Sequence, residues 1–412
     1  MRRLPEGTKR DRRELDLQTT LGVALLAARG QGASETGRTY ARARDLAERL
    51  GETQQQLRAV YGLSAHHNTR GDFRAGGEAA ETLLRLAKAH GDETGQAAGY
   101  RILGATATIV GQFVDGRAYL EAVLAGPSAR DGWQAASLYA MDPWVVASGW
   151  LAWPLLLSGH PEQAWDRHRE SLTRARELAH PNTLAQVLFI GCTFCQLCSD
   201  PGGVLERAEE LSALATEQGF PLWRGAAMAL EGWALAREGR TEQGIEKIGQ
   251  GIAAYCATEA ELWRPLFLGL SAEAHALEGR QAEARQLLTE AVDRAERTGE
   301  RWFEAELHRL EGAVMIRGGT PDPVAAEGHL QKAVDLARSQ RAKWWELRAT
   351  TNLARRWRDE GRLAEAHGLL TPVCNWFTEG FDTPDLREAR ALLSALTSCI
   401  RPPGVSLKTD HS

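Results

Sequence analysis

The sequence predicts an all-α fold, a right-handed α-solenoid of about nine helix pairs with a C-terminal capping helix. Three observations predict it: a glycine marker that recurs about every 40 residues, a tryptophan that recurs in the same phase, and a helical apolar period between the markers. One helix pair cannot bury its own apolar face. The pairs must therefore stack on their neighbours, and a stack of helix pairs is a solenoid.

The glycine marker has the form Glu-Gly-Arg at Gly239, Gly279 and Gly361, and Gly318 takes the place of the missing middle member. A glycine at this point suits a turn after a helix, because it adopts a left-handed conformation without strain. The recurrent tryptophans are Trp223, Trp263, Trp302 and Trp345. We interpret them as packing residues that set the angle between units, since periodic bulky residues are usually core; a bound aromatic ligand is the alternative.

The stretch between two markers contains two apolar stripes. Leu266, Leu270 and Ala274 share one helical face, and Ala284 and Leu288 share another after the glycine. Each unit is therefore a helix A, a tight turn and a helix B. A small residue near the middle of helix A, such as Gly232 or Gly312, lets the two helices approach closely.

The units divide the chain into five segments. A threonine cap and a first-turn proline at Thr383 and Pro384 open the capping helix. The expected order is a basic segment over 1–14, repeats 1–3 over 15–126, a longer connection over 127–143, repeats 4–9 and the capping helix over 144–398, and a disordered tail over 399–412.

Composition restricts the partners and the compartment. The chain has 412 residues and a formal net charge of −5, so it has no general basic surface for nucleic acid or for an anionic membrane. The longest apolar stretch is shorter than the roughly 20 residues of a membrane span. Six cysteines are too few for a disulfide scaffold in a chain of this length. We expect a cytoplasmic protein.

A search for chemical motifs predicts no enzyme activity, cofactor or metal. The sequence has no Gly-x-x-x-x-Gly-Lys phosphate loop and no His-Glu-x-x-His pattern. Cys192, Cys195 and Cys198 have a spacing that is typical of metal loops, but their flanks read as one apolar helix, on which the three sulfurs would fan apart. Buried apolar cysteines are the favoured interpretation, and a metal or redox role is the alternative.

Helix pairs of this form resemble tetratricopeptide (TPR) repeats, lengthened here to about 40 residues. Several phrases resemble the C-terminal repeat region of bacterial signalling proteins in which an adenylate or guanylate cyclase domain is fused to a AAA/STAND-type ATPase; they are residues 10–18, 40–44, 215–223, 300–307 and 376–386. The resemblance implies that such repeats sense a signal and regulate an attached cyclase or ATPase. The motifs of those catalytic domains are absent from this sequence.

The sequence therefore predicts a non-catalytic protein-interaction or regulatory module that binds a protein or peptide segment, with a cyclase or ATPase as one candidate partner. The alternative is a small-molecule-sensing repeat domain of a signalling or transcription regulator. In TPR units, fixed positions of helix A face the concave side, and counting from the small residue selects a candidate groove: Trp153, Leu156, Trp233, Arg309, Arg348, Arg355 and Arg358. The competing interpretation makes the indoles packing residues and the arginines solvated.

Overall fold

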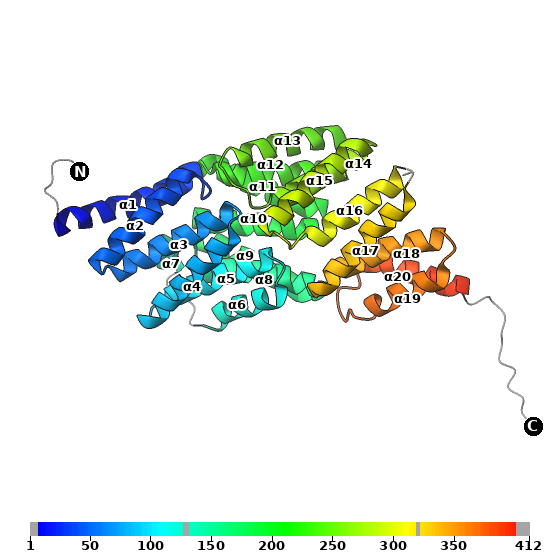
Figure 1. Cartoon of the computed structure of the whole chain (residues 1–412), viewed down its shortest axis with the longest axis horizontal. Helices are drawn as coiled ribbons and strands as arrows, with labels where there is room; N and C mark the ends of the chain where they lie inside the picture. The colour runs from blue at the N-terminus through cyan, green and yellow to red at the C-terminus, as the bar shows by residue number, and fades with distance from the viewer. Residues whose placement is uncertain (1–6, 127–131, 319–321, 401–412) are drawn as a thin grey trace, which may run out of the picture.

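The computed structural model describes residues 7–126, 132–318 and 322–400. In these ranges the chain forms twenty α-helices and no strand, arranged as nine antiparallel pairs, one extra helix α7 and a final helix α20 (Figure 1). The predicted all-α solenoid of TPR-like helix pairs with a capping helix is thus confirmed.

The helix A of each pair precedes its helix B along the chain. The pairs are α1 (Thr8–Arg29) and α2 (Ser34–Leu50), α3 (Thr53–Thr69) and α4 (Phe73–Ala89), α5 (Glu93–Ile109) and α6 (Phe113–Ala125), α8 (Pro143–Leu157) and α9 (Pro161–Leu178), α10 (Pro181–Leu197) and α11 (Pro201–Gln218), α12 (Pro221–Arg237) and α13 (Thr241–Cys256), α14 (Arg264–Leu277) and α15 (Gln281–Thr298), α16 (Glu304–Arg317) and α17 (Pro323–Ser339), and α18 (Lys343–Asp359) and α19 (Leu363–Cys374).

Turn glycines mark the ends of most of the helices A. Gly239 and Gly279 adopt φ angles of 88° and 79°, in the left-handed region where a side chain would be strained. Gly318, which we placed in the same series, has a φ of −75° and ends α16 in an ordinary conformation. The marker spacing therefore located all three turns, although only two of these three glycines use the left-handed conformation.

Parts of the chain that were expected to lie outside the helix pairs are helical in the structure. Helix α1 begins at Thr8, within the expected basic segment 1–14. Within the expected connection 127–143, residues Gly132–Tyr139 form α7, whose Ala135, Ala136 and Tyr139 are buried. The capping helix α20 spans Pro384–Ile400, and the rest of the expected tail, 401–412, lies outside the described residues.

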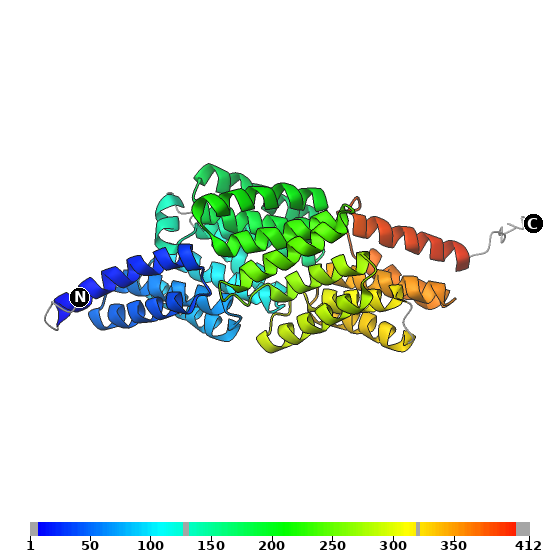
Figure 2. The same ribbon diagram turned by 90° about the horizontal axis from the view of Figure 1, so that it is seen from above.

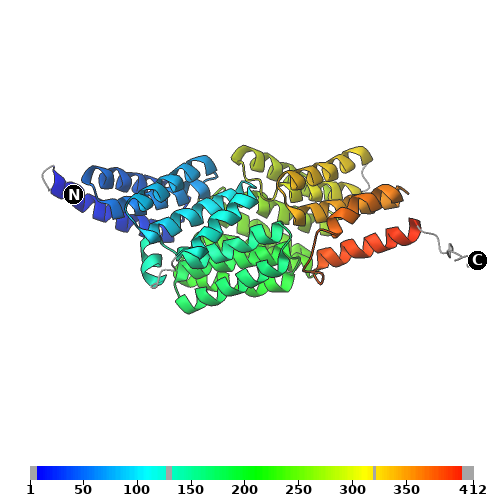
Figure 3. The same ribbon diagram turned by 90° about the horizontal axis from the view of Figure 1, so that it is seen from below.

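The solenoid winds so that early repeats contact late ones. The carbonyl oxygen of Thr69 accepts hydrogen bonds from the backbone N–H groups of Glu261 and Leu262, at 2.9 and 3.1 Å. The carbonyl oxygen of Ile109 accepts two from Arg301 and Trp302, at 3.0 and 3.1 Å. The turns of early repeats thus dock on the loops between late repeats, and Figures 2 and 3 show the blue-to-cyan helices lying against the green ones.

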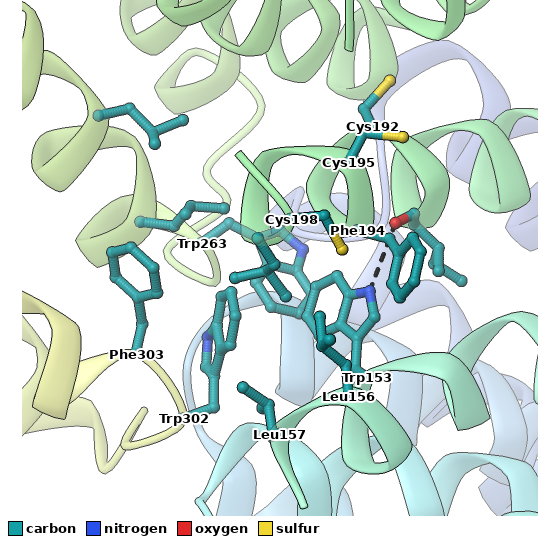
Figure 4. Close-up of a cluster of buried hydrophobic side chains, with 14 of the residues drawn as sticks. Trp153, Leu156, Leu157, Cys192, Phe194, Cys195, Cys198, Trp263, Trp302 and Phe303 are labelled. Atoms are coloured by element: carbon teal, nitrogen blue, oxygen red, sulfur yellow. Dashed lines mark hydrogen bonds between the residues drawn. The ribbon is translucent and has the colours of Figure 1, made fainter. Parts of the chain in front are cut away.

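This winding fills the concave side of the central repeats. Helix α8 is buried at every position except Trp144, as expected for a helix surrounded by protein. Its Trp153 stacks on Trp302 with ring centroids 4.7 Å apart (Figure 4). Its Trp150 stacks on Trp263 at 5.7 Å. The recurrent tryptophans are 0–6 % exposed, which supports the packing interpretation.

Candidate functional site

A groove lies in the C-terminal half of the chain, where the winding leaves the concave side open. It has a volume of about 570 Å³ and is bounded by α12, α14, α16, α18, the end of α10 and the start of α20. Trp233, Leu310 and Val314 provide apolar surface inside it. A volume of this size suits a small molecule or a short segment of a partner.

Four of the seven predicted groove residues line this groove: Trp233, Arg309, Arg348 and Arg355. The structure does not bring the other three to it. Trp153 and Leu156 are fully buried in the central core, because the late repeats cover the concave face of α8, so their prediction as groove residues is corrected. Arg358 lies outside the groove lining and pairs with its neighbour Asp359 at 2.7 Å.

Arg348 is the centre of a buried polar network at the inner end of the groove. Its Nε donates to Asp385 Oδ1 at 2.7 Å, its Nη1 to Glu306 Oε1 at 3.2 Å, and its Nη2 to the carbonyl oxygen of Leu197 at 2.6 Å. Burial disfavours the charged form of Arg348, but the carboxylates of Asp385 and Glu306 outweigh it and raise the pKa of the guanidinium. The network therefore ties α10, α16, α18 and the capping helix together.

Glu306 is shared by two arginines. Arg309 donates to both of its carboxylate oxygens at 2.8 Å, and Arg348 donates to one of them. Burial would raise the pKa of Glu306, yet the two guanidinium groups hold it below its ordinary value. Arg355 pairs in turn with Glu388 of α20. The arginines that were predicted to line the groove as a cationic surface are thus neutralised by carboxylates of the same chain.

Trp233 forms part of the wall rather than an exposed anchor. It is 2 % exposed, and its indole Nε1 donates to Glu273 Oε2 at 2.7 Å. Arg237 donates to the other oxygen of Glu273 at 3.2 Å. The hydrogen bond to Glu273 thereby fixes the indole in one orientation.

The outer lip of the groove combines apolar and cationic side chains that the sequence analysis missed. Leu277 and Ile316 are 37 and 39 % exposed at the ends of α14 and α16. The neighbouring Arg317 makes no ion pair with any described residue; its Nη1 lies 3.5 Å from the carbonyl oxygen of Ala276. A usable signal was present, because Leu277 and Ile316 each stand two residues before the turn glycine of their unit.

Two carboxamide side chains on the groove walls have hydrogen-bonding capacity to spare. Gln196 is 4 % exposed, and its Oε1 is buried without a partner among the described residues. Asn352 is half-buried, lines the groove from α18 and has no side-chain hydrogen bond recorded in the described structure. The two amides offer donors and acceptors of the kind that pair with peptide groups.

The three clustered cysteines lie on α10 and are buried as apolar residues. In Figure 4 the sulfurs of Cys192 and Cys195 point away from the tryptophan cluster, whereas that of Cys198 points towards it. Burial raises the pKa of all three thiols, that of Cys195 to about 12. Within the described ranges no group of three His, Cys, Asp or Glu side chains is arranged to hold a metal ion.

Searches against known proteins identify the fold but no family. No family model matches the sequence. An uncharacterized protein of Rhizobium meliloti (strain 1021) is 26 % identical over 202 residues, which are 49 % of this chain and 19 % of that protein. The chain thus spans about a fifth of the length of the curated relative it matches.

Two solved structures resemble the chain in fold. The apo form of the quorum sensor NprR from B. thuringiensis is 14 % identical with a TM-score of 0.51, over 88 % of this chain and 97 % of that one. A STAND protein with a tetratricopeptide repeat sensor from Pyrococcus horikoshii is 12 % identical with a TM-score of 0.44, over 81 % of this chain and 52 % of that one. At these identities the likeness concerns the fold alone. Separately, no helix within the described ranges has the length and apolarity to cross a bilayer.

Proposed function

We propose that this chain is a non-catalytic, TPR-type interaction module that binds a segment of a partner protein in its C-terminal groove. The observation that carries the proposal is the outer lip, where exposed Leu277 and Ile316 stand beside Arg317, which has no ion pair among the described residues. Apolar side chains exposed in a concave site are typical of a binding surface.

The charges of the groove favour a partner segment with one carboxylate. The acidic residues Glu273, Glu306 and Asp385 are each held by an arginine of the groove. Arg317 is left to pair with a ligand, and guanidinium groups bind carboxylates through two hydrogen bonds. We therefore propose an extended segment that places an apolar side chain on the lip, a carboxylate at Arg317 and its main chain near Gln196 and Asn352.

The regulatory role rests on the resemblance stated above. We propose that the repeats form one solenoid with a longer connection at 127–143. We propose further that they regulate a signalling protein such as a cyclase or ATPase, either in the same polypeptide or as a separate partner. The large size of the curated relative is compatible with further domains beside such repeats. Capture from the source cell with mass spectrometry, using wild type and Leu277→Asp as baits, tests this role. A cyclase or ATPase that only the wild type captures supports it.

Groove binding itself is tested with a library of short random peptides displayed for selection. Selected peptides are synthesised, and their affinities are measured by fluorescence polarisation. Leu277→Asp and Arg317→Glu are expected to weaken binding about tenfold or more, because each removes one anchor of the lip. Arg358→Glu is the matched control, since Arg358 lies outside the groove lining. Equal affinity for all four proteins would contradict the proposal.

A further inference from the structure

The turn after helix A is covered in early repeats and bare in repeat 7, which consists of α14 and α15. In repeats 2 and 3, the residue two places before the turn glycine is Thr69 or Ile109, and its carbonyl oxygen accepts two backbone N–H groups from a late loop. The equivalent residue of repeat 7 is Leu277, whose carbonyl oxygen accepts no hydrogen bond from any described residue. Thr69 and Ile109 are buried, whereas Leu277 is exposed. A side chain added at Gly111 would touch late residues, but one added at Gly279 would meet nothing within 4 Å.

The two late loops that cover the early turns have the same form. Each passes through two residues of irregular backbone and a two-residue turn directly into a helix, at 260–264 and 300–304. The two turn residues are bulky and apolar: Leu262 and Trp263 in one loop, Trp302 and Phe303 in the other. The N–H of the first turn residue and the N–H of the residue before it are the two donors. We call a segment of this form a docking loop.

The apolar pair of a docking loop packs on helix A of the next repeat. The ring of Trp302 stacks on Trp153 of α8, which directly follows the small residue of that helix (Figure 4). In α16 the small residue is Gly312, so Ala313 holds the position of Trp153. Ala313 and Leu277 both line the C-terminal groove of about 570 Å³. An alanine here leaves room for a bulky side chain of a ligand.

We propose that the partner segment contacts the lip of the groove as a docking loop: its two consecutive N–H groups donate to the carbonyl oxygen of Leu277, and its bulky apolar pair packs over Ala313. This inference rests on the function proposed above and names the form of the partner, a short loop that begins a helix. The turns of successive repeats lie along one edge of a solenoid. The surface at Leu277 therefore continues the edge on which this chain already docks two loops of its own.

The probe is a fluorescent peptide with the sequence of residues 298–310, which holds one docking loop and the start of the following helix. Its binding to the full-length protein is followed by fluorescence polarisation. We expect saturable binding that Leu277→Asp weakens about tenfold or more. N-methylation of the peptide at Arg301 and Trp302 removes both donors and is expected to weaken binding about tenfold. N-methylation at Gly299, before the donors, is the matched control and is expected to leave the affinity unchanged.

A substitution in α16 tests where the apolar pair lies. Ala313→Trp fills the space from the protein side and is expected to weaken peptide binding about tenfold, whereas Arg358→Glu, outside the groove lining, is expected to bind as wild type does. Absence of saturable binding overturns the inference. So does binding that survives N-methylation of both donors, which requires no change to the protein and hence no test of its folding.

The peptides selected from the random library separate this inference from the proposed function. Selected peptides that bind in a Leu277-dependent way, while the loop peptide does not bind, show that only the docking-loop form is wrong. If no selected peptide depends on Leu277, the proposed function itself fails.

Discussion

The central repeats and the C-terminal repeats are built from the same helix-pair unit. Their concave faces differ, because the central one is filled and the C-terminal one is open. In the central repeats, late loops dock against α8 and α10, and stacked indoles fill the space. In the C-terminal repeats α12, α14, α16 and α18 instead border a groove of about 570 Å³. The difference shows that the concave face of one and the same repeat unit is filled or open depending on whether distant repeats cover it.

The largest expected loss of stability comes from a substitution in the filled core of the central repeats. Trp153→Ala removes an indole that is fully buried against Trp302, so we expect a loss of about 3–5 kcal/mol in the free energy of unfolding. Urea unfolding followed by circular dichroism measures it. Trp133→Ala, at a residue that is 51 % exposed, should change stability by less than about 1 kcal/mol. Similar losses of stability in the two variants would contradict the conclusion that Trp153 belongs to a filled core.

The next effect concerns the boundary between the groove and the core. Arg348→Met leaves the buried carboxylates of Glu306 and Asp385 without their shared guanidinium, and we expect a loss of about 3 kcal/mol. Adding Asp385→Asn removes one stranded charge and should recover about 1 kcal/mol or more of that loss in urea unfolding. A double variant that is less stable than the single variant would show that Arg348 and Asp385 are not coupled in this way.

A smaller effect is the pH dependence of stability that arises in the filled core of the central repeats. Glu300 accepts hydrogen bonds from Trp302 Nε1 and from the N–H of Trp263, and burial raises its pKa from 4.5 to about 8. The folded state therefore holds a proton that the unfolded state releases, so stability falls as the pH rises from 4.5 to 8. The expected slope is up to about 1.4 kcal/mol per pH unit within this window.

Glu300→Gln isolates this contribution, because a glutamine keeps the hydrogen-bond acceptor but does not titrate. Urea unfolding of both proteins at several pH values gives the difference in slope. His168 and His308, whose pKa values burial lowers to about 3, titrate in both proteins and cancel. The nearby Glu261 is also present in both proteins, so it does not contribute to the difference between them. Parallel stability curves for wild type and variant would contradict the prediction.

The smallest effect on stability is expected at the groove lip. Leu277 is 37 % exposed, so Leu277→Asp should change the free energy of unfolding by no more than about 0.5 kcal/mol. The same change should abolish most of the peptide affinity, which sharpens the contrast with Trp153→Ala. A large loss of stability in Leu277→Asp would place the lip in the scaffold instead of the binding surface.

The local architecture of this protein was predictable from the sequence alone. Helix A, turn and helix B follow from short-range rules of apolar period, glycine conformation and capping, which operate within one unit. The marker glycines, the capping helix that begins at Pro384 and the packing role of the recurrent tryptophans all follow from such rules. The same rules select the positions of helix A that face the concave side, among them Trp233, Arg309, Arg348 and Arg355 of the groove lining as well as Trp153, Leu156 and Arg358, which lie outside it.

Only the tertiary structure decided which concave positions are open. Trp153 and Trp233 occupy the same position of their respective units, yet one stacks inside the core and the other lines the groove. The cause is contact between residues nearly half the chain apart, such as Ile109 with Trp302. Such contacts depend on the small rotation between successive units summed over several repeats, which no single unit specifies.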